Sequence, residues 1–155
     1  MQRTYLRSPW TPWSLRPAAI AALFLALGVV AAGAQTPSVE DLIERACASS
    51  TSNVELKGCL GKFAEKADRD LNAVWKRVLA SIDTSELKPA QRLDWRKKLT
   101  AAQRHWVQFR QADCSEPVGY EWFGGTGMGG AVSTCIAKHT LDRIRHLEAR
   151  YLDRK

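Results

Sequence analysis

The sequence predicts an all-α fold, a small antiparallel bundle of three to four helices with two disulfides. Apolar residues recur at steps of three or four over long stretches, which is the period of a helix. No long stretch alternates apolar and polar residues as a half-buried strand does. Four widely spaced cysteines are present. A chain of 155 residues has room for one domain, so a multidomain enzyme is not expected.

The first 34 residues show the three parts of a secretory signal peptide. The leading part holds three arginines and no acid, an uncharged apolar run covers 18–32, and Ala32-Gly33-Ala34 has the small residues of a cleavage site. We therefore expect cleavage after Ala34. The mature chain, residues 35–155, is expected to be periplasmic or secreted.

The alternative for this leader is an uncleaved membrane anchor, because residues 18–34 are uncharged and 17 residues reach the lower limit of a spanning helix. The run is rich in alanine and ends in small residues, which favours cleavage. After cleavage we expect no stable membrane span. No cysteine follows the expected cleavage site, so a lipid anchor is not indicated.

Two helices are predicted before residue 84. Ser38 precedes Glu40 and Asp41, which is the pattern of an N-cap with acids in the first turn, and this helix is expected to run to about Cys47. Ser52 with Glu55 three residues on is a capping box that starts the second helix. Gly58 and Gly61 weaken its first turns, where a bend is expected. Its apolar stripe is Leu60, Phe63, Ala67, Leu71, Val74, Trp75, Val78, Leu79 and Ile82.

A third helix is predicted from Pro89, since proline suits the first helical position. It is expected to end near Cys114, where Glu116-Pro117 breaks it. A glycine-rich segment follows, and a last helix starts at about Ala131. The predicted apolar side of the third helix is Leu93, Leu99, Ala102, Trp106, Phe109 and Ala112, and that of the last is Ile136, Thr140, Ile144, Leu147 and Tyr151.

The cysteines predict two disulfides, because an even number in a small exported domain reads as a disulfide framework. Three pairings are possible. The helix placement favours Cys47 with Cys59 and Cys114 with Cys135, since each bond then closes a short loop. Zinc binding is the alternative, but zinc cysteines usually come in close C-x2-C pairs, which this sequence lacks. No metal and no other cofactor is predicted.

The loop 115–134, between the last two cysteines, combines glycines with aromatic residues and acids. Its glycines lack the spacing of a phosphate-binding loop, and no strand precedes them. Aromatic residues on a constrained surface loop serve as contact anchors, and the alternative is that they pack back onto the helices. The candidate partner contacts are Glu116, Tyr120, Glu121 and Trp122.

The sequence shows no catalytic constellation, so we expect a protein that is not an enzyme. His139 and His146 lie seven residues apart on one helix, and His105 has no acid at a suitable spacing. No nucleophile elbow and no H-E-x-x-H motif occurs.

The chain is basic, with 23 basic and 16 acidic residues and a net charge of +7. Three of the basic residues lie in the leader, so the mature chain carries +4, an ordinary level for solubility. We interpret the basic faces of the third and last helices as solvated, and we expect no nucleic acid partner for an exported protein.

One face of the third helix combines polar and aromatic residues. Gln103, Trp106 and Arg110 share it, at i, i+3 and i+7. Polar side chains on a packing face predict a buried or half-buried network in which every group finds a partner. We expect Arg110 to bond an acid or helix-end carbonyls and to have a structural role.

Several spaced motifs stand out between Cys47 and Leu152. They are Ala67-Asp68-Arg69-Asp70-Leu71-Asn72 with Val74-Trp75, then Leu99-x-x-Ala102-Gln103-x-x-Trp106-x-x-x-Arg110-x-x-x-Cys114, then Gly124-Gly125-Thr126-Gly127 and Cys135-x-x-x-x-Thr140-x-x-Arg143-x-x-x-Leu147. Together they resemble the LprI-like lysozyme-inhibitor domain. The resemblance implies a small, disulfide-bonded helical protein of the bacterial envelope. Its motif residues look like scaffold: Asp68, Leu71, Asn72, Gln103, Trp106, Arg110, Thr140 and Arg143.

The resemblance also implies a partner, a lysozyme or related muramidase that the protein binds and inhibits. Animal c-type lysozymes are basic, so a partner of net charge +4 gains no steering from its overall charge and needs a local patch. The loop 115–134 offers acids and aromatic residues for this contact. The alternative is a periplasmic interaction or structural module that binds an envelope protein or glycopolymer without lysozyme inhibition. The sequence does not indicate an oligomeric state.

Overall fold

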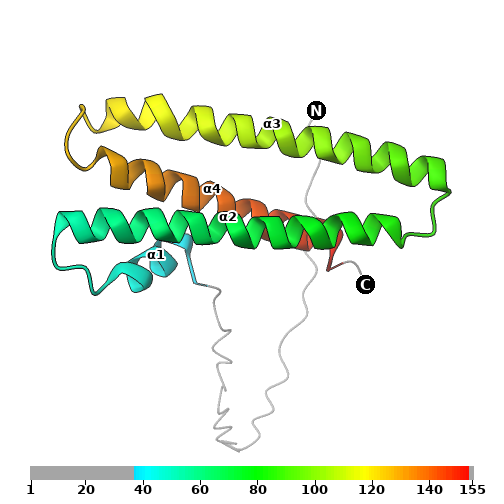
Figure 1. Cartoon of the computed structure of the whole chain (residues 1–155), viewed down its shortest axis with the longest axis horizontal. Helices are drawn as coiled ribbons and strands as arrows, with labels where there is room; N and C mark the ends of the chain where they lie inside the picture. Colours follow the sequence, from blue (N-terminus) through cyan, green and yellow to red (C-terminus); the bar gives the residue numbers. More distant parts are fainter. Residues whose placement is uncertain (1–36, 154–155) are drawn as a thin grey trace, which may run out of the picture. The chain divides into compact units, whose positions relative to one another are not determined.

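The computed structural model describes residues 37–153, and the expected leader with its cleavage site lies outside them. Within this part the chain forms four helices and no strand, which confirms the all-α prediction. The helices are α1 (Val39–Cys47), α2 (Asn53–Asp83), α3 (Pro89–Glu121) and α4 (Met128–Tyr151). The long helix α3 runs antiparallel to both α2 and α4, and the short α1 lies near the start of α2 (Figure 1).

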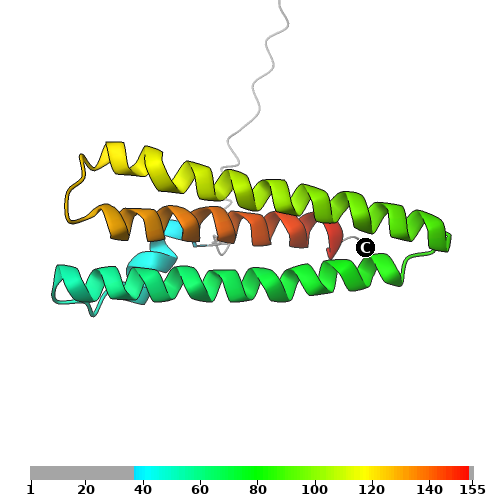
Figure 2. The ribbon, with the colours of Figure 1, turned by 45° about the horizontal axis from the view of Figure 1, so that its top comes forward.

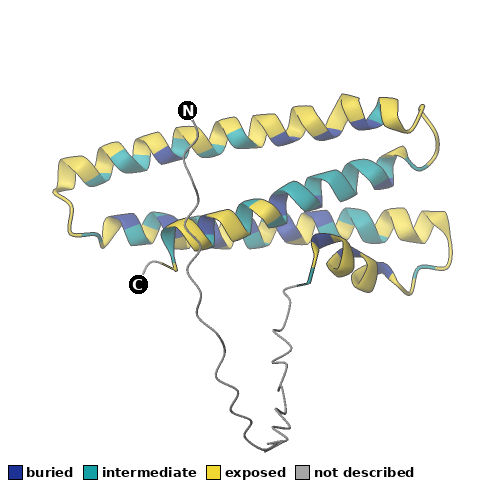
Figure 3. Cartoon of the chain, turned by 180° about the vertical axis from the view of Figure 1, so that it is seen from behind, coloured by how far each residue is buried: buried dark blue, intermediate teal, exposed yellow. Residues whose placement is uncertain are grey.

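Helix α4 is central to the bundle, since both α2 and α3 pack along it (Figure 2). The main core joins α2 and α4 with one residue of α3 and consists of Leu71, Val74, Val78, Ile82, Leu99 and Leu147. A second, smaller core fixes α1 and consists of Val39, Ile43, Ala64 and Ala137. Helix α3 is exposed over most of its surface (Figure 3). No helix of the described residues is long and apolar enough to cross a membrane.

The first two helices begin where the sequence predicts. Ser38 caps α1 reciprocally, because its Oγ accepts the Asp41 N–H at 3.0 Å and its own N–H donates to the Asp41 carboxylate at 3.1 Å. Ser52 caps α2 by accepting the Glu55 N–H at 3.3 Å. The expected box at this second helix is half formed. The Glu55 carboxylate reaches one residue further back and accepts from the N–H and hydroxyl of Thr51, at 2.8 and 2.9 Å.

The predicted end of α3 near Cys114 is wrong, because the helix continues through Pro117 to Glu121. A proline in a helix removes one hydrogen bond to the carbonyl four residues earlier. Here that loss falls close to the helix end. The residues on both sides of the proline are held in place, Cys114 by its disulfide to α4 and Val118 by burial, and these contacts outweigh the missing bond.

Helix α4 starts at Met128, three residues before the predicted start, so Gly129 and Gly130 are helical. A Cβ on Gly130 would lie 3.2 Å from the Leu60 side chain, and one on Gly129 would lie 2.5 Å from Lys57. Gly130 therefore lets α4 lie close against α2 at Leu60, whereas the flexible end of Lys57 could move away from a side chain at 129. The non-helical segment between α3 and α4 is 122–127, much shorter than the loop 115–134 that we expected.

The predicted apolar side of α3 is only partly correct. Leu99 is buried and Trp106 is half-buried, but Leu93 is 69% exposed, and Ala102, Phe109 and Ala112 are exposed as well. The residues of α3 that are buried are Leu99, Arg110, Cys114 and Val118. The packing face of α3 thus includes hydrogen-bonded polar groups, which a search for the most apolar face misses. The predicted face of α4 is confirmed, with Thr140 and Leu147 fully buried.

The disulfides join the expected pairs. Cys47 bonds Cys59, tying α1 to α2, and Cys114 bonds Cys135, tying α3 to α4, with Cα–Cα distances of 5.8 and 5.5 Å. Both bonds lie where α2 begins, α3 ends and α4 begins, which we call the disulfide end of the bundle (Figure 1).

The start of α2 is expected to make stability depend on pH. Hydrogen bonds from the backbone N–H and the hydroxyl of Thr51 hold the pKa of Glu55 below its usual value of 4.5. A carboxylate whose pKa is lowered by folding stabilises the fold above its unfolded pKa, and this contribution is lost as the pH falls through the folded pKa. Thermal melting should therefore show Glu55→Gln less stable than wild type at neutral pH, with the difference shrinking below pH 4.5. Glu65→Gln, exposed beyond the first turns of α2, is the control. A difference that is constant with pH would contradict this role.

Candidate functional site

Arg110 joins the three long helices. It projects from α3, is 8% exposed, and donates from Nη1 to the Asp68 carboxylate of α2 and to Thr140 Oγ1 of α4, the latter at 2.5 Å. Thr140 in turn donates to the Ile136 carbonyl at 2.7 Å. A buried guanidinium is tolerated only where a carboxylate and further hydrogen bonds compensate for its lost hydration. This contact sets how the three helices sit on one another.

Trp106 lies between two arginines next to this contact. The guanidinium carbon of Arg110 is 5.3 Å from the ring centroid and that of Arg143 is 5.5 Å, so both make cation–π contacts. Arg143 Nε donates to Gln103 at 2.9 Å. Burial lowers the pKa of Arg143 from its usual value. The polar network expected around Arg110 is therefore present. One part of the expectation is wrong, because the buried Nε of Arg110 has no hydrogen-bond partner among the described residues.

Two of the family-motif residues lie outside this network. Leu71 is buried in the main core, while Asn72 is exposed on α2. The other six motif residues bond or stack with one another across α2, α3 and α4: Asp68, Gln103, Trp106, Arg110, Thr140 and Arg143. These contacts support a structural role for them.

A groove of about 800 Å³ opens at the disulfide end, between the start of α2, the end of α3 and the start of α4. Its apolar lining includes Leu56, Leu60, Val118, Trp122 and Gly130. Its charged lining is mixed in sign, with Lys57, Asp113, Glu121, Lys138 and Asp142, and the His139 ring lies among them. Several of these charges are already paired within the chain, among them Lys138 with Glu40 at 2.5 Å.

The four predicted contact residues divide between two faces of this end. Glu121 and Trp122 line the groove, whereas Glu116 and Tyr120 border a separate surface hollow on α3. Tyr120 is 80% exposed. The Trp122 indole lies against Gly127, where an added Cβ would stand 2.4 Å from the ring, so Trp122 packs back while keeping one side in solvent. Trp122 thus packs back in part, as one alternative expects, while Tyr120 is exposed, and partner contact stays a prediction.

Phe123 belongs to the aromatic residues of the predicted loop, although it is not one of the four predicted contact residues. Its side chain is 96% exposed, and its backbone has a φ of +48°. The sequence signal is weak, since a phenylalanine before two glycines does not by itself indicate this conformation.

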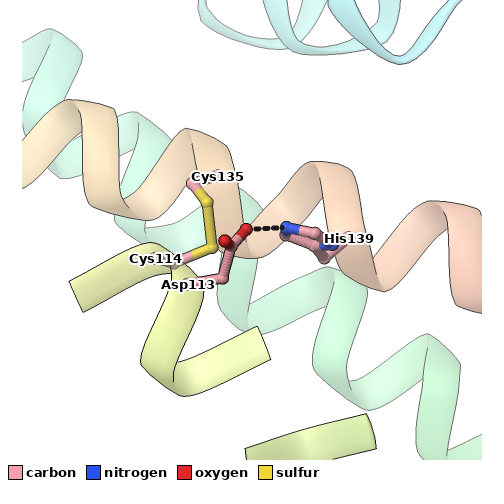
Figure 4. A group of neighbouring side chains, drawn as sticks. All are labelled: Asp113, Cys114, Cys135 and His139. Atoms are coloured by element: carbon pink, nitrogen blue, oxygen red, sulfur yellow. Dashed lines mark hydrogen bonds and ion pairs between the residues drawn. A yellow bond between two sulfur atoms is a disulfide. The ribbon is translucent and has the colours of Figure 1, made fainter. Parts of the chain in front are cut away.

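A group of potential metal ligands lies beside the groove, but its sulfurs are committed to a disulfide. Ligand atoms of Asp113, Cys114, Cys135 and His139 lie within 4.8 Å of one another (Figure 4). Both cysteines are bonded to each other, and His139 Nε2 pairs with the Asp113 carboxylate at 2.8 Å. The His139 ring also meets Phe109 edge-on, with centroids 5.5 Å apart. With the disulfide formed, these four residues connect α3 to α4.

Comparison with known families decides the family. The model described as "Lysozyme inhibitor LprI" matches residues 45–147. The chain belongs to this family. The matched range holds both disulfides, the Arg110 network and the whole lining of the groove.

Among curated proteins, the LprI-family chain is similar to the uncharacterized protein R02472 of Rhizobium meliloti (strain 1021). The two are 29% identical over 138 residues, which cover 86% of this chain and 94% of that protein. No solved structure matches the chain.

The Arg110 network makes a prediction for stability. Asp68→Asn removes the charge that compensates buried Arg110 and should destabilise the fold by about 1–3 kcal/mol, a value reduced because Asp68 is itself 43% exposed. Asp70→Asn, which breaks only the exposed pair with Lys66, is the matched control and should cost about 0.5 kcal/mol or less. Urea unfolding measures both. Equal losses would contradict the importance of the network.

Proposed function

We propose that this protein is exported and that it binds and inhibits a lysozyme or related muramidase, without a catalytic step of its own. Membership of the LprI family over residues 45–147 carries the proposal. The signal-peptide pattern of residues 1–34 supports export to the compartment where such a partner is met, and the two disulfides fit an oxidising compartment.

The disulfide end is the surface we assign to the contact. Two acids, Glu116 and Glu121, lie there, and no ion pair involving either occurs among the described residues. They supply the local negative charge that a basic lysozyme needs from an inhibitor that is itself basic. Tyr120 and Trp122 stand beside them with exposed ring surface, and aromatic residues commonly dominate the energy of protein interfaces.

The same end is also rigid, which favours tight binding. The bond between Cys114 and Cys135, the His139–Asp113 pair and the packing of Trp122 on Gly127 all restrain the segment that joins α3 to α4. A surface that is already ordered loses less conformational entropy on association.

Lysis assays test the proposal directly. The oxidised protein, purified after export, is titrated into c-, g- and i-type lysozymes at low and at physiological salt. We expect saturable, stoichiometric inhibition of one type. Folded protein that inhibits none of them would contradict the proposal and favour an envelope module that binds a protein or glycopolymer. Turnover of isolated peptidoglycan by the protein would contradict the absence of catalysis.

Export is tested separately by mass spectrometry of the protein recovered from the periplasm or medium. We expect a chain that begins at Gln35, because cleavage follows the small residues at 32–34. A chain retaining its leader in the membrane fraction would support the anchor instead.

The contact surface makes its own prediction. Glu121→Ala combined with Trp122→Ala should weaken lysozyme binding by more than about 1 kcal/mol while leaving the helical circular dichroism unchanged. Glu86→Ala combined with Leu87→Ala removes an acid and an exposed apolar residue from the turn between α2 and α3, at the opposite end of the bundle, and is the matched control. Equal affinities of the two double variants would exclude Glu121 and Trp122 from the contact.

A further inference from the structure

Phe123 combines two unfavourable features. Its φ of +48° is in the left-handed region, which side chains with a Cβ avoid because the Cβ approaches the following carbonyl. Its side chain is 96% exposed, so the ring gains almost no burial within the chain. Glycine is the usual residue in this conformation after a helix, and Gly124, at the next position, also has a positive φ of 70°.

The backbone around Phe123 is well held, so its outward position is part of the fold. The N–H of Phe123 donates to the Tyr120 carbonyl at 3.2 Å, and the N–H of Gly124 donates to the Gly119 carbonyl at 3.3 Å. One residue further on, the N–H of Gly125 donates to the Trp122 carbonyl at 2.8 Å. The turn therefore presents the aromatic ring to solvent at the tip of the disulfide end.

The reason for a phenylalanine here lies outside the fold. Within the described residues the ring contributes almost no packing, and a glycine would take the same backbone conformation without strain. Strain and an exposed aromatic side chain that coincide at one residue are typical of a functional position. A rigid projecting aromatic residue is an interface anchor that fits a concave surface of a partner.

We propose that Phe123 enters the polysaccharide-binding cleft of the lysozyme that this protein inhibits, an inference that rests on the proposed function. Such a cleft is concave, and ligand clefts are lined mainly by apolar and aromatic groups that can cover an inserted ring. Occupying it also explains how binding would block the enzyme. Tyr120 is 80% exposed, and its carbonyl accepts the N–H of Phe123, so it belongs to the same projecting turn. Glu121 lines the groove whereas Glu116 lies at the separate hollow, so the two acids would meet the basic rim on different sides of the inserted turn.

The decisive variant is Phe123→Gly, because it is expected to move stability and binding in opposite directions. Removing the strain should raise the melting temperature by roughly 2–5 °C. Removing the ring should weaken lysozyme binding by about tenfold or more. Phe123→Tyr keeps an aromatic ring and should retain binding, while Leu93→Ala, which trims an exposed apolar residue near the other end of α3, should leave binding unchanged.

A competition experiment identifies the cleft. Lysozyme saturated beforehand with a soluble trimer of N-acetylglucosamine should bind the wild-type protein more weakly, in proportion to the occupancy of the cleft by the sugar. Wild-type affinity that is unchanged by the trimer would overturn insertion into the cleft. Full binding by Phe123→Gly, or a variant less stable than wild type, would overturn the assignment to Phe123. Absence of wild-type binding to any lysozyme would instead overturn the proposed function, and this inference with it.

Discussion

The charge-assisted contact of Arg110 with Asp68 and Thr140 is the constraint on which the position of α3 depends. Helices α2 and α4 share an apolar core, but α3 contributes to that core mainly through Leu99. An apolar contact between smooth helix faces tolerates sliding, whereas a hydrogen-bonded guanidinium fixes both distance and direction. Arg110 and the disulfide at Cys114 lie one turn apart, so together they fix the end of α3 that presents the groove and the projecting turn.

Features encoded by short sequence patterns were predictable. The capping serines, the proline at the start of α3 and the even number of cysteines each determine local structure through a few neighbouring groups, and the helices and disulfides agree with them. The features that were wrong depend on tertiary contacts. Pro117 is kept in a helix by tertiary contacts of its neighbours, the disulfide of Cys114 to Cys135 and the burial of Val118. Leu93 and Phe109 are exposed because α3 packs through a partly polar face.

The sequence indicated the region of the candidate site along the chain but not its secondary structure. An acid- and aromatic-rich segment between two cysteines indicated the region, yet the expected loop is largely helix with a short turn. Because this segment is helical, Glu116 and Tyr120 lie on a different face from Glu121 and Trp122. The predicted loop gave no reason to expect this separation. The left-handed backbone of Phe123 depends on how α3 ends and α4 begins, so no pattern of residue types within the segment indicates it.

The bonded motif residues and the proposed contact surface are separate parts of the molecule. The motif residues hydrogen-bond to one another between the helices. Because such contacts are directional, few other side chains could replace these residues. The side chains of Glu116, Tyr120 and Phe123 on the proposed surface are exposed, so their replacement should cost the fold little, and in the case of Phe123 should relieve strain. Under the proposed function, affinity for the lysozyme depends on side chains on which folding does not depend, so a change of target would leave the Arg110 network intact.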